Sequence, residues 1–290
     1  MQPTGLYRFT SIARPVDPAY PTNRALLALL PVLAIAGALA SIAGVGAASP
    51  QTAALGAVLS GFGAWAVARE LAPDDNPAAF VSLVFAFGAQ IAWGPATVIP
   101  MFITLVLTRI VNRTTGVPPK WFETLLLLGF VTWAMARLGD PLIGIAATVA
   151  FFLDASLSRP ARWQLLTGMV CLFAALYFVL RDGVGMPAMF ASGDAYLAVA
   201  LVVLSMFAVL LLGTRDVLAV GDVSLTALDP ARVRGGMFIA LFVAAAAPRY
   251  NVDPGINPLL LAVIGGVVAS RLLTWFNRRS VGTGASGQGR

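Results

Sequence analysis

Long apolar runs constrain this chain more than any other feature of its sequence. Ten runs follow one another, and hydrophobic residues make up 59% of the chain against 11% charged residues. A soluble domain carries about 25% charged residues, and one soluble core could not bury so many apolar runs. The sequence therefore predicts an all-α polytopic membrane protein with about ten transmembrane helices. The runs cover Ala25–Ala47, Thr52–Ala68, Ala78–Trp93, Ala96–Ile110, Phe122–Ala136, Pro141–Leu157, Trp163–Leu180, Ala195–Gly213, Gly235–Ala247 and Pro258–Phe276.

The distribution of positive charge favours two helices, not one, between Ala78 and Ile110. With two helices there, fifteen Lys and Arg residues fall on one side of the membrane and three, Arg137, Arg181 and Arg249, on the other. Cytoplasmic loops of membrane proteins carry the excess of Lys and Arg. The sequence therefore predicts ten spans in a bacterial inner membrane, with both termini in the cytoplasm.

The segments outside the apolar runs give the predicted domain organisation. Residues 1–24 contain four prolines and are expected to form a cytoplasmic tail. Residues 25–276 form a single transmembrane domain, in which residues 214–234, with six charged residues, are the largest cytoplasmic loop. Residues 277–290 are rich in Gly and Ser, which predicts a disordered tail.

An internal repeat relates two of the predicted helical hairpins. Leu59–Val81 aligns without a gap with Leu127–Val149, and eleven of the 23 positions are identical. The matches include a Phe, a Trp, an Arg and a Pro, which are less expected by chance than Ala or Leu. The shift moves the match by three helices, an odd number, so the two hairpins should enter the membrane in opposite directions. Inverted repeats of this kind build many transporters.

Composition excludes several kinds of chemistry. The chain has no histidine and a single cysteine, Cys171, so imidazole or thiolate metal sites, Ser-His-Asp triads and internal disulfides are ruled out. We expect no cofactor. The net charge of +6 fits retention of cytoplasmic loops better than binding of nucleic acid.

Few polar residues fall within the apolar runs, and they are the candidate pathway residues, because polar groups in hydrocarbon are costly unless they are paired or functional. Gln90 precedes a break at Trp93, Pro95 and Pro100, where freed backbone groups could line a cavity or simply form an outer loop. Asp154 could be a deep proton or cation site or an interfacial partner of Arg159. Arg271 needs the inner interface, a carboxylate or an anionic substrate.

Other charged residues have simpler interpretations. Arg69 and Arg137 each follow a tryptophan by one turn, as interfacial anchors do at a helix end. Asp74 and Asp75 are adjacent and are weak candidates for a metal site, although a solvated turn explains them better. Glu123, at the start of a run, reads most simply as a surface residue.

Three functions remain open on the sequence alone. The leading hypothesis is a secondary transporter or channel for a small molecule. The alternatives are a membrane enzyme acting on a lipid or isoprenoid phosphate, with Arg109, Arg113 and Lys120 holding the phosphate, and a non-catalytic subunit of a membrane complex. Membrane lipids are the expected partners, with an oligomer or a larger complex left open. Transport should place polar groups at mid-depth, whereas catalysis should cluster charged groups at one interface.

Overall fold

The computed structural model describes residues 7, 9–45, 48–93, 98–182, 195–246 and 258–284, which form ten α-helices. By length and composition, six of these helices could each cross a membrane: α1, α2, α3, α5, α7 and α10. The helices are α1 (Pro21–Ile42), α2 (Pro50–Leu71), α3 (Asn76–Trp93), α4 (Ile99–Asn112), α5 (Trp121–Leu138), α6 (Leu142–Ser156), α7 (Gln164–Asp182), α8 (Ala195–Gly213), α9 (Pro230–Ala246) and α10 (Pro258–Gly284).

Proline marks most of the helix starts. Six helices have Pro at their first or second position, where its missing N–H would have no partner within the helix and its fixed φ suits the first turn. At the N-terminal end of α9, the Asp229 carboxylate caps the helix by accepting a hydrogen bond from the Ala231 N–H at 2.8 Å. Pro230 follows this cap as the first residue of the helix. Residues 230–234, expected in the loop, therefore form the first turn of α9.

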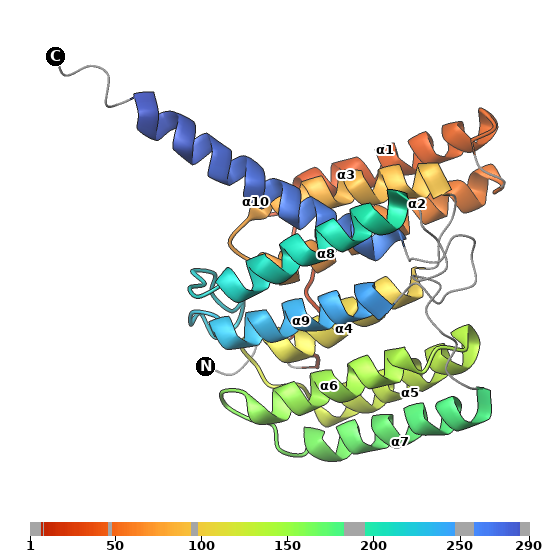
Figure 1. Ribbon diagram of the computed structural model, residues 1–290, viewed down its shortest axis with the longest axis vertical. Helices are drawn as coiled ribbons and strands as arrows, with labels where there is room; N and C mark the ends of the chain where they lie inside the picture. Colours follow the sequence, from red (N-terminus) through yellow and green to blue (C-terminus); the bar gives the residue numbers. More distant parts are fainter. Residues whose placement is uncertain are drawn as a thin grey trace.

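The helices form two blocks on either side of a central pair (Figure 1). The first block contains α1, α2, α3 and α10, and the second contains α5, α6 and α7. The central pair, α4 and α9, packs against α2 on one side and α6 on the other, and the blocks meet chiefly through it. Helix α8 covers α9 and α10.

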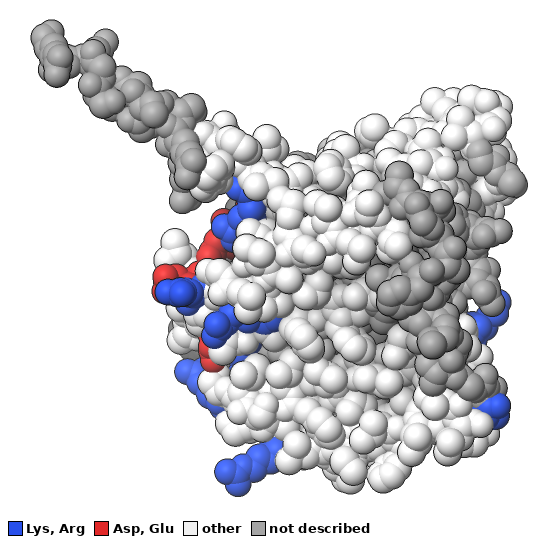
Figure 2. All heavy atoms as spheres, viewed as in Figure 1, with Lys and Arg blue, Asp and Glu red and all other residues white. Residues whose placement is uncertain are grey.

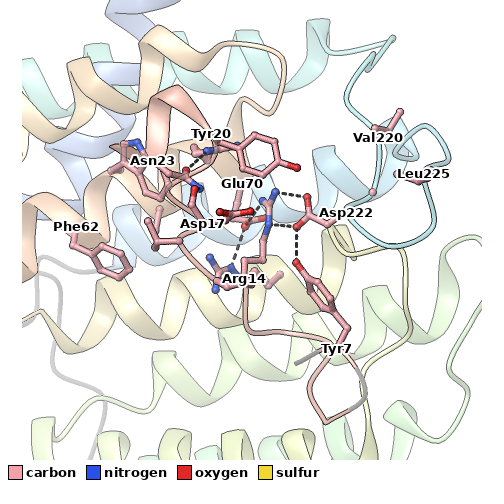
Figure 3. Close-up of a pocket in the computed structure, with 17 residues that line it drawn as sticks. Tyr7, Arg14, Asp17, Tyr20, Asn23, Phe62, Glu70, Val220, Asp222 and Leu225 are labelled. Carbon is pink, nitrogen blue, oxygen red and sulfur yellow. Dashed lines mark hydrogen bonds and ion pairs between the residues drawn. The ribbon is translucent and has the colours of Figure 1, made fainter. Parts of the chain in front are cut away.

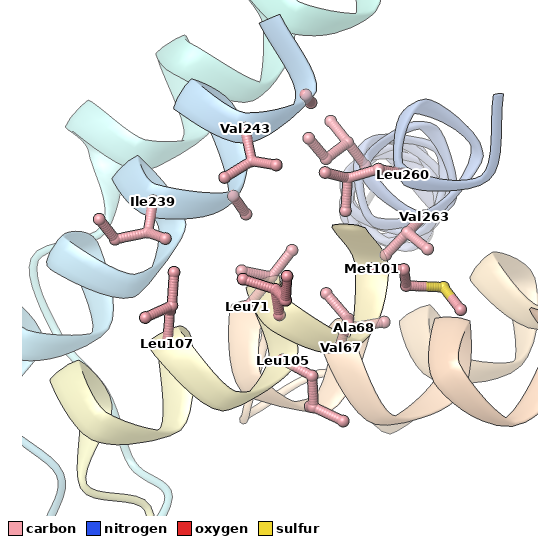
Figure 4. Packing of buried hydrophobic residues seen from close by; sticks show 14 of the residues in the cluster. Val67, Ala68, Leu71, Met101, Leu105, Leu107, Ile239, Val243, Leu260 and Val263 are labelled. Carbon is pink, nitrogen blue, oxygen red and sulfur yellow. The ribbon is translucent and has the colours of Figure 1, made fainter. Parts of the chain in front are cut away.

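Helix α4 is too short to span a bilayer unaided but is well protected. Its 14 residues extend over about 21 Å, less than the hydrocarbon thickness of about 30 Å. Ten of these residues are buried against neighbouring helices, so its ends need not meet lipid. Figure 4 shows the apolar core that it makes with α2, α9 and α10, where Val67, Leu107, Ile239 and Leu260 have at most 1% of their surface exposed.

One end of the bundle, which we call the charged end, gathers most of the acidic and basic side chains visible in Figure 2. Side chains that meet here come from the starts of the odd-numbered helices, the ends of α2, α4 and α6, and the middle of α10. The pairs are Asn23 with Arg69, Arg109 with Glu70, Arg232 with Asp154, Gln164 with Thr124, and Ser270 with Asp75. Helices α1 to α7 therefore run in alternate directions along this bundle, and α9 begins at the charged end like the other odd-numbered helices.

Both predicted tails differ from expectation where the structure describes them. Residues 9–20 are not a free tail: they lie against the charged end, and α1 begins at Pro21, four residues before the predicted boundary. At the other terminus, α10 continues past Phe276 to Gly284, so part of the segment expected to be disordered is helical. Figure 1 shows this part of α10 projecting beyond the bundle.

Candidate functional site

Glu70 is the centre of the charged end. It lies in the last turn of α2, and its side chain has no exposed surface. The Arg109 Nε of α4 donates to its carboxylate at 3.0 Å, and the Arg14 Nη1 approaches the same oxygen at 3.3 Å. Asn112, one turn after Arg109, donates to the Glu70 backbone carbonyl at 2.8 Å. One buried carboxylate thus joins α2, α4 and the N-terminal segment.

Glu123 anchors the N-terminal segment to α5. Its carboxylate accepts hydrogen bonds from the hydroxyls of Thr10 and Ser11 and from the Ser11 backbone N–H, the last at 2.6 Å. It also accepts from the Lys120 N–H at 3.0 Å and so caps its own helix. Glu123 is 6% exposed, so the expectation of a surface residue is wrong. Thr10 and Ser11 lie more than a hundred positions earlier in the chain, so no local pattern indicates their contact with Glu123.

Arg14 connects Glu70 to the α8–α9 loop. Its guanidinium forms a two-pronged contact with Asp222 of the α8–α9 loop, at 2.6 Å and 2.8 Å. Burial alone would lower the pKa of Arg14, but Glu70 and Asp222 outweigh it and raise that pKa above its usual value. The Tyr7 hydroxyl also donates to Asp222, at 3.5 Å, and burial together with this carboxylate raises the pKa of Tyr7.

A cavity of about 420 Å³ lies beside these contacts (Figure 3). We call it the Glu70 cavity. The N-terminal segment, the start of α1, the second half of α2 and the α8–α9 loop enclose it, and Arg109 of α4 reaches its wall. Its aromatic lining consists of Tyr7, Tyr20, Phe62 and Trp65. Three arginines face three carboxylates around it, so the cavity is polar without a large net charge.

Asp154 forms a second buried ionic cluster at the end of α6. Its side chain has no exposed surface, and one carboxylate oxygen accepts hydrogen bonds from Arg113 Nε and Arg232 Nη1, both at 2.8 Å. The expected pairing with Arg159 is wrong: Arg159 contributes its backbone carbonyl to Arg113. Arg113 and Arg109 are one turn apart at the end of α4, and they reach towards opposite blocks.

Asp74 and Asp75 point to different partners. Asp75 lies 3.6 Å from Arg271 and accepts a hydrogen bond from Ser270 at 3.1 Å, so Arg271 has a carboxylate partner near the charged end. Asp74 accepts hydrogen bonds from the backbone N–H groups of Leu218 and Ala219. These bonds attach the α8–α9 loop to the α2–α3 turn. Within the described residues, no three carboxylate or thiol side chains gather as a metal site would require.

Gln90 sits between α2 and α3. It is 5% exposed, accepts a hydrogen bond from the Ser60 hydroxyl at 3.1 Å and packs against Gly56. Trp93 ends α3 and is half exposed, whereas Pro100 lies in the first turn of α4 and so begins a helix. Pro95 lies outside the described residues. The break expected around Gln90 therefore falls between two separate helices.

The two repeat units share local geometry but not environment. Phe62 stacks on Trp65 with ring centroids 6.4 Å apart, and Phe130 stacks on Trp133 at 5.7 Å. Trp65 is 6% exposed, and Arg69 lies 5.0 Å above its ring. Trp133 is 50% exposed, and Arg137 is also exposed. The anchor interpretation thus suits α5, whereas in α2 the same residues face the Glu70 cavity.

The comparisons give no relative for this chain. No protein-family model, no curated protein and no solved structure matches it. The important residues that sequence reasoning missed are Glu70, Arg14, Asp222 and Arg232. Glu70 did carry one signal, since a carboxylate in the last turn of an apolar helix opposes the helix dipole and requires a cationic partner.

Proposed function

We propose that this protein is a secondary transporter for a small molecule, with the Glu70 cavity as the substrate-binding end of its route. Buried ionisable groups in a membrane protein are costly, and they commonly mark a substrate or ion pathway. Glu70 carries the proposal, because it is fully buried, lines the cavity and joins a helix of the first block to the central pair. The inner membrane is the proposed location, with the charged end facing the cytoplasm.

The arrangement of the helices supports two-body motion. Transporters with inverted repeats work by rocking one helix bundle against another around a site at their junction. Here the matched hairpins α2–α3 and α5–α6 belong to different blocks, which meet chiefly through α4 and α9. The Glu70 cavity adjoins the junction of α2 with α4, and apolar side chains such as Met101 and Leu105 fill the space deeper in the bundle.

The alternative of an enzyme with one composite phosphate and metal site has less support. Arg109 is engaged by Glu70, Lys120 donates to the Tyr7 carbonyl, and Arg113 is engaged by Asp154. The two aspartates proposed for a metal have different partners: Asp74 binds the α8–α9 loop, and Asp75 contacts Arg271. These groups therefore offer no common centre for catalysis. No specific contact favours the complex-subunit alternative.

Distances between spin labels test the proposed motion. In a Cys171→Ala background, one label pair at Ile42→Cys and Arg137→Cys reports across the two blocks, since both positions are exposed at the end opposite the charged end. Rocking predicts two distance populations in lipid, with their ratio changing when Glu70→Gln weakens the junction. A single narrow distance in both proteins would contradict a two-block transporter.

A pair within one block provides the control. Labels at Arg137→Cys and Arg181→Cys sit at the ends of α5 and α7, which pack together in the second block. This pair should give one distance whatever the state of Glu70. If the control pair shows the same two populations as the test pair, the spread reflects label rotamers and not block motion.

A further inference from the structure

A second depression at the charged end has the features of a binding site, and this interpretation does not depend on transport. It has a volume of about 890 Å³ and lies between the end of α4, the α6–α7 turn and the α8–α9 loop. We call it the arginine groove, because Arg113, Arg159, Arg162 and Arg232 line it. The α8–α9 loop separates it from the Glu70 cavity: residues 220–222 face that cavity and residues 226–229 face the groove.

The groove has an excess of positive charge. Two carboxylates, Asp154 and Asp229, accompany the four arginines, which leaves two positive charges uncompensated locally. Asp154 is bound by Arg113 and Arg232, and these two arginines are nearly buried, at 8% and 5% exposure. Asp229 accepts hydrogen bonds from the Ser158 hydroxyl and the Ala231 N–H, and among the described residues it forms no ion pair with Arg159 or Arg162.

Arg159 and Arg162 supply the unused donors. Both side chains are exposed, and within the described part of the chain neither guanidinium has a hydrogen-bond or ion-pair partner. Arg159 has a backbone φ of +52°, a left-handed conformation that is uncommon for a residue with a side chain and that occurs disproportionately at binding sites. Two free guanidiniums beside two fixed ones suit a phosphate group, which accepts paired N–H donors.

The rim of the groove continues onto the apolar outside of the bundle. Trp163 lines the groove and is 41% exposed, and Leu165 and Leu166 follow it at the start of α7 with 49% and 72% exposure. Tryptophan prefers the headgroup level of a membrane, and exposed leucines face acyl chains. A ligand whose phosphate lies in the groove would therefore have a direct path for its chains along α7.

We infer that the arginine groove binds the phosphate headgroup of an anionic membrane lipid. A phosphate monoester headgroup fits best, because it offers the most acceptor oxygens and negative charge to Arg159 and Arg162. The same headgroup chemistry could come from a free phosphate compound, but the exposed apolar rim favours the lipid. Binding would tie α7, the α8–α9 loop and the end of α4 to one leaflet of the membrane.

The experiment compares lipids by thermal-shift titration of the full-length protein in neutral detergent. Dioleoyl phosphatidic acid should raise the melting temperature, and dioleoyl phosphatidylcholine should not. In Arg159→Gln/Arg162→Gln the apparent dissociation constant should rise about tenfold or more, since the loss of even one charge-assisted hydrogen bond costs about a factor of ten. Arg159→Lys/Arg162→Lys should fall between, because lysine keeps the charge but not the paired donors.

A matched control separates a site from general attraction. Arg24→Gln/Arg215→Gln removes two exposed arginines from the same end of the molecule but outside the groove. This control should keep the wild-type affinity for phosphatidic acid. Equal weakening in the control and groove variants would overturn the inference. If inorganic pyrophosphate alone gives the full shift and competes with the lipid, the lipid assignment is rejected in favour of a soluble phosphate.

Discussion

The carboxylate of Glu70 and the guanidinium of Arg109 join α2 to α4 at 3.0 Å, with the carboxylate fully buried. This pair connects the first block to the central pair, so it is both a stabilising contact and the candidate hinge of the proposed motion. Arg109 keeps 15% of its side-chain surface exposed and Arg14 keeps 20%. The pair is therefore only partly screened by water, and the carboxylate has lost all of its hydration.

Removing the Glu70 charge should destabilise the fold. Glu70→Gln keeps the shape but leaves two arginines around a neutral amide, and we expect a loss of about 2 kcal/mol in the free energy of unfolding, below the range for fully buried pairs. Thermal or denaturant unfolding in detergent measures this loss. Asp216→Asn is the control, because Asp216 is exposed, and its change should stay within about 0.5 kcal/mol. Equal effects of the two changes would mean that the ion pair contributes nothing.

The adjacent glycines of α10 should tolerate a methyl group very differently. A Cβ on Gly266 would lie 2.4 Å from the Ser82 Cα of α3, whereas a Cβ on Gly265 would meet nothing closer than 3.6 Å. Gly266→Ala should therefore separate α3 from α10 and cost about 1–3 kcal/mol. Gly265→Ala should be neutral or slightly stabilising. The two melting temperatures in detergent decide this, and a tolerated Gly266→Ala would mean that α3 and α10 are less closely packed.

Gln90→Leu should leave the stability of the protein nearly unchanged. The variant loses the hydrogen bond from Ser60, and such bonds between membrane helices contribute about 0.6 kcal/mol on average. Leucine, in return, is better tolerated in hydrocarbon. A purely structural Gln90 predicts the same small loss in Ser60→Ala, which a melting curve measures. If Gln90→Leu instead alters the label distances across the blocks, Gln90 belongs to the transport route.

The cap of α9 should make stability depend on acid pH. Burial would raise the pKa of the Asp229 carboxyl, but hydrogen bonds from Ser158 and Ala231 and the charge of Arg232 outweigh it, so the pKa lies below its usual value. A lowered pKa stabilises the fold above the unfolded-state value near 4, and this contribution is lost as pH falls through the folded-state value. Ser158→Ala should reduce it by about 0.5 kcal/mol at pH 7 and leave stability unchanged below about pH 3. Melting temperatures between pH 3 and 7 test the difference, and an equal loss at both ends of that range would exclude a charge effect.

Much of the helical architecture could be predicted from the sequence, because apolar runs and proline positions are local signals. The separation of α3 from α4 followed from counting charges. The boundaries are less accurate: the charges of residues 214–234 predict a loop, although Asp229 followed by Pro230 within it is also a typical helix start. The short length of α4 could not be predicted either. A helix of 14 residues is stable here because helices distant in sequence bury ten of its residues.

The candidate site was mostly beyond sequence reasoning. Glu70 and Arg109 are separated by 39 positions, and Glu123 and Ser11 by 112 positions. Each carboxylate has several arginines or hydroxyls available in the chain, and only the packing of the helices selects among them. Trp65 and Trp133 show the limit most clearly, because the same motif is buried in α2 and exposed in α5.

Two-sided labelling of a cysteine at position 62 tests whether the Glu70 cavity belongs to a transport route. Phe62 is the lining residue of the Glu70 cavity that lies deepest along α2, roughly 14 Å before Leu71, and the native Cys171 is buried and can be replaced by alanine. In sealed vesicles, a membrane-impermeant thiol reagent should reach Phe62→Cys from both sides. Controls at Asp216→Cys and Arg137→Cys, at opposite ends of the bundle, should each react from one side only. Reaction of Phe62→Cys from the charged end alone, under all conditions, would contradict transport through this cavity.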